Sequence, residues 1–170
     1  MKQKNVALVC VCLLLACCSY HLRGTGSSLP PHIKKIHVPM FTNQTTRFQL
    51  DLKLTESIRD ELVARGKVEL TGDQADADAV LIGNIMTFTV NPISFTEEAA
   101  ADHYNIIIVA KIVLRDLVNR RILFSNPSFT FIEEYETTEG TDYETVQQEA
   151  IDKVSLKFAR TLVITMLEGF

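Results

Sequence analysis

Apolar residues recur at helical spacing in two separated segments of the chain. The first stripe runs from Phe48 to Leu62, with Thr46 and Gln49 placed as a capping box at its start and Gly66 just beyond its end. The beginning of this stripe also alternates as a strand would, but the two end signals favour a helix. The pattern therefore predicts a helix that begins near Thr46 and ends before Gly66.

The second helical stripe lies close to the C-terminus. Its apolar residues recur every four positions from Val146 to Phe158. Thr141 and Glu144 are spaced as a second capping box, and Gly169 stands where the stripe stops. We therefore expect a long helix that reaches almost to the end of the chain.

Short runs of alternating or continuously apolar residues predict strands between these helices and before the first. Asn119 and Arg120 separate two such runs, which indicates a tight hairpin, and Asn126–Pro127 indicates a bend in the last run. A longer acidic loop, residues 91–103, separates the preceding pair. The predicted strands are residues 34–40, 67–70, 79–90, 104–116 and 121–135.

The element order β-α-β-β-β-β-α predicts an α+β fold. We expect a two-layer sandwich with two helices packed on one face of a mixed, mainly antiparallel sheet of four or more strands. The other face is also rich in apolar residues, because residues 106–109 are apolar at both parities and Phe129 shares a face with Phe131. Since no third helix is predicted to cover that face, we expect a partner there. Phe88 and Phe95 complete the set of aromatic candidates for this contact.

The four cysteines all fall within the first 18 residues, at positions 10, 12, 17 and 18. Lys2 and Lys4 precede an apolar run, residues 6–16, which is too short for a stable membrane-spanning helix and typical of a signal peptide. We therefore assign residues 1–16 to a signal peptide, residues 17–32 to a tether or linker, and residues 33–170 to one domain.

Leu14-Leu15-Ala16-Cys17 has the form of a bacterial lipobox. A lipobox needs cysteine because its thiol takes a diacylglyceryl thioether, and cleavage then frees the amine for an N-acyl chain such as palmitate. Cys17 is the predicted acylation site and Cys18 the alternative, while a plain signal peptide with incidental cysteines is the competing interpretation. Several acyl chains give a lasting tether, and the absence of aspartate after the cysteine favours the periplasmic side of the outer membrane. We expect no cofactor other than this covalent N-acyl diacylglycerol anchor.

Charge and motifs provide little support for nucleic-acid binding or catalysis. The net charge is −4, with no basic excess of the kind that nucleic-acid binders carry. The histidines lack the spacing of a zinc site, and no nucleophile elbow or phosphate-binding loop occurs. Glu133, Glu134, Glu136 and Glu139 leave a hydrolase as a weak alternative, although acidic runs beside turns are usually solvated. We therefore expect a protein that is not an enzyme and holds no metal.

Basic residues are sparse but grouped. Lys111 and Arg115 share a strand face by their even spacing, and Arg120 and Arg121 lie at the hairpin turn. These four residues are candidates for binding lipid phosphates, and simple exposed charges are the alternative.

Several short motifs occur in order along essentially the whole chain. They are Cys18-Ser19-Tyr20-His21-Leu22-Arg23-Gly24, Leu29-Pro30, Ile36 to Met40, Pro39-x-Phe41-x-Asn43, Leu54-Thr55 with Arg65-Gly66, and Ala79-Val80-Leu81-x-Gly83-x-Ile85. Together these motifs resemble the LptE family of lipopolysaccharide-assembly lipoproteins. The spacing of this family to the Tyr-His-Leu-Arg motif places the acylated residue at Cys18, whereas the lipobox itself favours Cys17.

The resemblance implies a non-enzymatic plug inside an LptD-like outer-membrane β-barrel, which helps to assemble the barrel and to deliver lipopolysaccharide to the outer leaflet. The four candidate aromatic residues would then contact the barrel. The family also binds lipopolysaccharide through basic loop or strand-edge residues. This chain departs from that pattern, because residues 91–103 contain Glu97, Glu98 and Asp102 but no Lys or Arg. The four basic residues above are the remaining candidates, and an envelope lipid-binding or scaffolding lipoprotein without a barrel is the alternative function.

Overall fold

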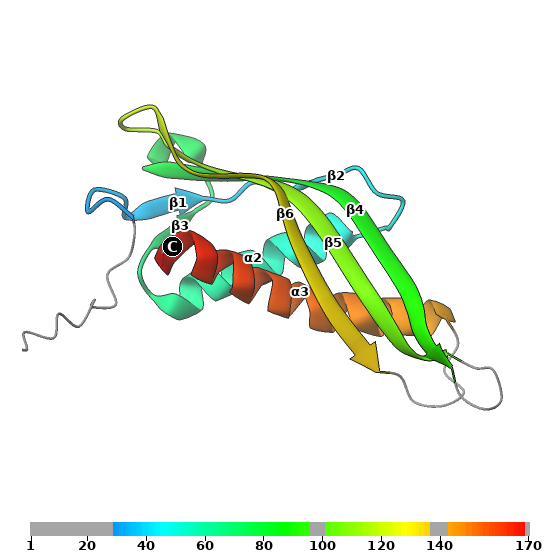
Figure 1. Ribbon diagram of the computed structural model, residues 1–170. Coiled ribbons are helices and arrows are strands. Elements are labelled where there is room, and N and C mark those ends of the chain that lie inside the picture. The colour runs from blue at the N-terminus through cyan, green and yellow to red at the C-terminus, as the bar shows by residue number, and fades with distance from the viewer. Residues whose placement is uncertain (1–28, 96–100, 137–142, 169–170) are drawn as a thin grey trace, which may run out of the picture.

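The structure, a computed structural model, describes residues 29–95, 101–136 and 143–168. Two helices lie on one side of an open, mixed six-stranded sheet, as Figure 1 shows, and this arrangement confirms the predicted α+β fold. The elements in chain order are β1 (Lys35–His37), β2 (Thr42–Asn43), α2 (Leu50–Arg65), β3 (Glu69–Thr71), the 3₁₀ turn η1 (Gln74–Asp76), β4 (Ala79–Phe95), β5 (Ala101–Asp116), β6 (Arg121–Glu136) and α3 (Tyr143–Glu168).

The sheet combines short parallel strands with a long antiparallel meander. Its order is β3-β1-β4-β5-β6. β2 also pairs in parallel with β4, at residues further along β4 than those that pair with β1. The β5–β6 hairpin is present as predicted, closed by Asp116 opposite Arg121, with Arg120 in the left-handed region at φ 55°. β4 and β5 extend further than their sequence patterns predicted and shorten the loop between them.

Two irregularities determine which side chains of the meander face the helices. The register of β4 against β5 shifts between Ile85 and Thr87, and that of β5 against β6 shifts near the predicted bend. At the bend, Asn126 Oδ1 accepts a hydrogen bond of 3.0 Å from the Ser128 backbone N–H. A shift of one residue reverses the face on which every later side chain lies. The alternation of side chains before each shift therefore does not predict which side chains face the helices after it.

Helix α2 begins at Leu50, which corrects the prediction of a start near Thr46. Asn43 stabilises a turn in the preceding segment instead, because its Oδ1 accepts from the Thr45 N–H at 2.9 Å and its Nδ2 donates to the Arg47 carbonyl. Phe48 consequently lies outside the helix and is exposed. The predicted end is confirmed: Gly66 adopts φ 60°, and its N–H donates to the Val63 carbonyl at 3.0 Å. The predicted cap at Thr141 and end at Gly169 of the second helix lie outside the described residues.

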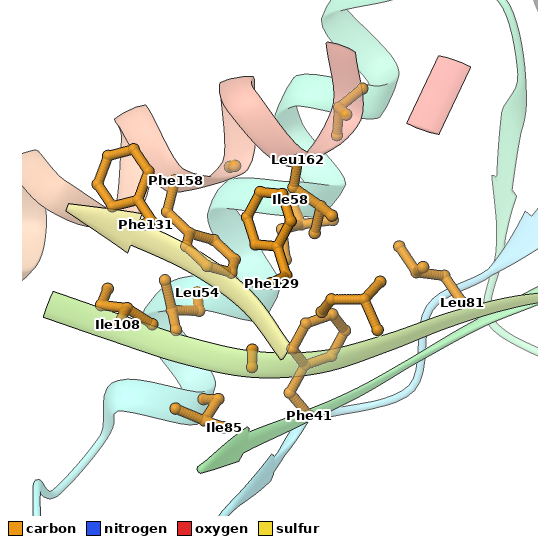
Figure 2. Close-up of a cluster of buried hydrophobic side chains, with 14 of the residues drawn as sticks. Phe41, Leu54, Ile58, Leu81, Ile85, Ile108, Phe129, Phe131, Phe158 and Leu162 are labelled. Atoms are coloured by element: carbon orange, nitrogen blue, oxygen red, sulfur yellow. The ribbon is translucent and has the colours of Figure 1, made fainter. Parts of the chain in front are cut away.

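The core lies between the helices and the sheet. Figure 2 shows Phe129 and Phe131 of β6 directed towards Phe158 of α3, and the ring centroids lie 5.4 and 5.8 Å from that of Phe158 in edge-to-face arrangements. α2 contributes Leu54 and Ile58 to the same cluster. The core therefore uses the helix-covered face of the sheet and leaves the other face to be considered separately.

Candidate functional site

The face of β4, β5 and β6 that points away from the helices, hereafter the open face, carries a band of aliphatic side chains. In the middle of the sheet, Ile107 and Val113 of β5 are half-buried. Val113 lies opposite Ile82 of β4, and Ile107 lies opposite Ile132 of β6. Ile82 and Ile132 are 41% and 56% exposed. Exposed aliphatic residues grouped on a sheet face are typical of a contact surface.

The polarity of the open face changes along the strands. Towards the β5–β6 turn, Lys111 and Arg115 of β5 are exposed on either side of Val113, and neither forms an ion pair with a described residue. At the opposite end, Asn105 of β5 lies beside Glu134 of β6, and Glu136 follows. A surface that meets this face should therefore be acidic or phosphate-bearing near Lys111 and Arg115, basic near Glu134 and Glu136, and apolar where it meets the aliphatic band.

The structure places three of the four predicted aromatic contacts in the helix-covered core or packed against it. Phe129 and Phe131 are 7% and 8% exposed, belong to the helix-covered core and offer almost no surface to a partner. Phe88 is partly buried against the same core, and the side chain of Phe95 lies outside the described part of the chain. Sequence alternation identified a second apolar face but assigned Phe129 and Phe131 to it, whereas Ile82 of β4 and Ile132 of β6 are its exposed residues.

The four predicted basic residues are separated by the fold. Lys111 and Arg115 share the open face, as their spacing predicted, whereas Arg120 lies in the turn. Arg121 is turned towards Asp116, and its Nε lies 3.4 Å from Asp116 Oδ2. Lys111 and Arg115 therefore remain the pair best placed to meet an anion on the open face.

Asp116 connects the hairpin to the beginning of the domain. Its fully buried carboxylate accepts a 2.9 Å hydrogen bond from the Asn119 N–H, and its Oδ2 lies 3.0 Å from His32 Nε2. Burial by itself raises the pKa of Asp116, but the hydrogen bonds from Asn119 and the contact with His32 outweigh burial and hold this pKa below its usual range. A charged carboxylate at this point thus fixes the hairpin against residue 32.

The glutamates of β6 border a groove of about 410 Å³ between β6 and α3. Glu133 forms an ion pair with Lys157, and Tyr135 donates a 2.7 Å hydrogen bond to Glu149. Burial, together with the Glu149 carboxylate, raises the pKa of Tyr135 to about 12. Glu139 lies outside the described residues. These contacts join β6 to α3.

Metal ligands and membrane-spanning helices were sought among the described residues as well. No group of three or more His, Cys, Asp or Glu side chains gathers there as a metal site. None of the helices in these ranges combines the length and apolar character needed to cross a bilayer.

Comparisons with known proteins agree with this architecture. Among solved structures, the chain is similar to protein XCC0632 from Xanthomonas campestris, with 14% identity, a TM-score of 0.55, and coverage of 81% of this chain and 88% of that one. It is also similar to the PelC dodecamer from Paraburkholderia phytofirmans, with 13% identity, a TM-score of 0.52, and coverage of 79% and 89%. The hypothetical protein CT253 from Chlamydia trachomatis matches with 10% identity, a TM-score of 0.53, and coverage of 77% and 94%. At these identities the likeness is one of fold.

Sequence comparison gives the family. No curated protein matches the chain by sequence. The model of the LptE family, described as lipopolysaccharide-assembly, matches residues 33–166, which is nearly the whole expected domain. The chain therefore belongs to the LptE family of lipopolysaccharide-assembly proteins.

Proposed function

We propose that this chain is an outer-membrane lipoprotein that plugs and helps to assemble an LptD-like β-barrel, and so supports the transport of lipopolysaccharide to the outer leaflet. Membership of the LptE family supports the role in lipopolysaccharide assembly. The lipobox ending at Cys17, with Cys18 as the alternative, supports an N-acyl diacylglycerol anchor on the periplasmic side. The role is one of binding, without a chemical step carried out by this chain.

The open face is the observation that carries the proposal. A sheet with one face covered by helices and the other exposed to water normally alternates apolar and polar residues, but here Ile82 and Ile132 remain exposed beside a half-buried aliphatic centre. Fully burying an isoleucine side chain contributes about 1.5–3 kcal/mol. A partner that encloses this face would gain that free energy at several positions, as the wall of a barrel around a plug would.

The ends of the open face give the proposal its polar contacts. Lys111 and Arg115 are exposed, and a phosphate or carboxylate placed between them would accept charge-assisted hydrogen bonds. Arg120 lies in the adjoining turn, whereas Arg121 already contacts Asp116. We therefore assign any lipopolysaccharide phosphate contact to Lys111 and Arg115 first.

Affinity purification of the full-length, tagged chain from detergent-solubilised membranes tests this function. We expect a large outer-membrane β-barrel protein to co-purify, and mass spectrometry of the mature N-terminal peptide to find acyl chains on Cys17 or Cys18. A Cys17→Ala, Cys18→Ala double variant is the control, because it lacks both possible anchors. Recovery of acylated protein with bound lipid but no barrel would support the envelope-scaffold alternative, and recovery of an unmodified periplasmic monomer would refute both.

A further inference from the structure

The tip of the β5–β6 hairpin, residues 117–122, exposes apolar and basic side chains outside the core, and its Ile122 lies opposite Arg115 of the open face. Val118 is 60% exposed and Ile122 is 59% exposed. Arg120 projects from a turn whose left-handed backbone is rarely adopted by a bulky residue. No acidic residue occurs within the tip. Aliphatic residues combined with arginine in a turn suit the boundary between water and a lipid bilayer.

The beginning of the described chain is fixed against this tip. His32 contacts Asp116 at the base of the hairpin, and the Leu117 N–H donates to the Asp78 carbonyl at 2.8 Å. Leu29 and Pro30 line a hollow of about 260 Å³ together with Ile122 and other residues of β6. Figure 1 shows the first described residues and the β5–β6 turn at the same end of the molecule. The chain that leads to the anchor therefore leaves the domain beside the tip.

The length of that chain limits how far the tip can lie from the membrane. Leu29 is 12 residues beyond Cys17. Twelve extended residues span at most about 40 Å. Once the anchor is inserted, the bilayer surface is therefore always within reach, and contact between the tip and the lipid becomes an intramolecular event with a high effective concentration.

We propose that the hairpin tip is a membrane-contact site that rests on the anionic phospholipid surface around the anchor. Val118 and Ile122 would enter the headgroup region, and Arg120 would meet lipid phosphates. The inference rests on the acylation included in the proposed function. Asp76 of η1 and Asp73, which caps η1, lie outside the tip, and their charge opposes adsorption of the whole end of the molecule. Because these aspartates repel anionic phospholipids, the proposed contact with the membrane is confined to the tip.

Lipid photolabelling of the full-length acylated protein tests the site. The protein is reconstituted in vesicles of phosphatidylethanolamine and phosphatidylglycerol that contain a phospholipid with a photoactivatable headgroup, and adducts are located by proteolysis and mass spectrometry. We expect adducts on the tether peptide and on the peptide that contains residues 117–122. Labelling of the tether peptide without the tip peptide would overturn the membrane-contact site while leaving acylation intact. Failure of the protein to carry acyl chains would overturn the proposed anchor and this inference together.

Two variants and a matched control separate a specific contact from general proximity. Val118→Asp removes the apolar contact, and Arg120→Asn removes the charge while tolerating the left-handed backbone. A basic residue near an anionic membrane contributes about five-fold to partitioning, so we expect each variant to reduce tip adducts about five-fold or more. Leu156→Asp alters an equally exposed residue on α3 and should leave the tip adducts unchanged. Unchanged tip labelling in both tip variants would refute the proposal, and circular dichroism checks that all three fold.

Discussion

Gly83 lies under the ring of Phe41, and this contact gives the sharpest test of how the fold is held together. A Cβ atom built at Gly83 would lie 2.1 Å from Phe41 Cε2 and 2.2 Å from Cδ2, far inside van der Waals contact. The ring is 2% exposed, and the Phe41 N–H donates to Thr55 Oγ1 at 3.0 Å. Because both the ring and its backbone are held, Phe41 cannot make room for a methyl group without losing contacts.

We therefore predict that Gly83→Ala destabilises the protein by about 2–4 kcal/mol. Forcing one extra methyl group into a packed core costs about 1–3 kcal/mol. If Phe41 is displaced from its site, the loss of folding stability approaches that of a buried Phe→Ala change, which is about 3–5 kcal/mol. The intrinsic preference of strands for alanine over glycine works in the opposite direction but spans less than about 1 kcal/mol.

Urea unfolding of the purified chain, followed by circular dichroism, measures this loss. Gly72→Ala is the matched control, because no atom lies within 4 Å of its added Cβ, and we expect its free energy of unfolding to change by less than about 0.5 kcal/mol. In a Phe41→Ala background, Gly83→Ala should cost almost nothing, since the ring it strikes is absent. Equal costs of Gly83→Ala in both backgrounds would refute the proposed contact.

Three further predictions concern polar groups. Thr55→Val should destabilise the fold by about 1–3 kcal/mol in the same assay, because it leaves the buried Phe41 N–H without its acceptor, whereas Thr55→Ser should cost less. Because the pKa of Asp116 is lowered in the folded protein, its charge stabilises the fold above about pH 4, and this stabilisation is lost as the pH falls. The destabilisation caused by Asp116→Asn should therefore shrink between about pH 4 and 2. A difference in unfolding free energy between the two proteins that does not change with pH would contradict this. The pKa of Tyr135, raised to about 12 by burial and Glu149, predicts that folding stability falls from about pH 10 to 12. Tyr135→Phe should then remove an ionisation near pH 12 from an ultraviolet titration.

Sequence patterns predicted the elements whose signals are local. The helical stripe before Gly66, the five main strands and the turn at Asn119–Arg120 each depend on neighbouring residues, and all are present. The two-layer arrangement followed from the order of the elements. One amphipathic helix lies between strands in the sequence and the other follows the last strand, and both must bury their apolar side against the sheet.

Features that depend on contacts between distant residues could not be predicted in this way. The Thr46 capping signal fails because Asn43 forms a competing turn. The interior position of Phe129 and Phe131 depends on the register shift near Asn126, which the pairing with β5 determines. The link from His32 to Asp116 joins residues 84 positions apart, and no local pattern reports such a contact.

The central claim is that the open face, on which Ile132 of the edge strand β6 lies beside Ile107 of β5, meets the partner of this protein. Site-specific photocrosslinking in cells tests it most directly, with p-benzoylphenylalanine in place of Ile132 and, as the comparison, in place of Leu156 on the outer side of α3. Both side chains are similarly exposed, at 56% and 62%, so they have comparable access to neighbours. We predict a strong crosslink from position 132 to a large outer-membrane protein and a weaker one from position 156. A crosslink from position 156 with none from position 132 would contradict the account.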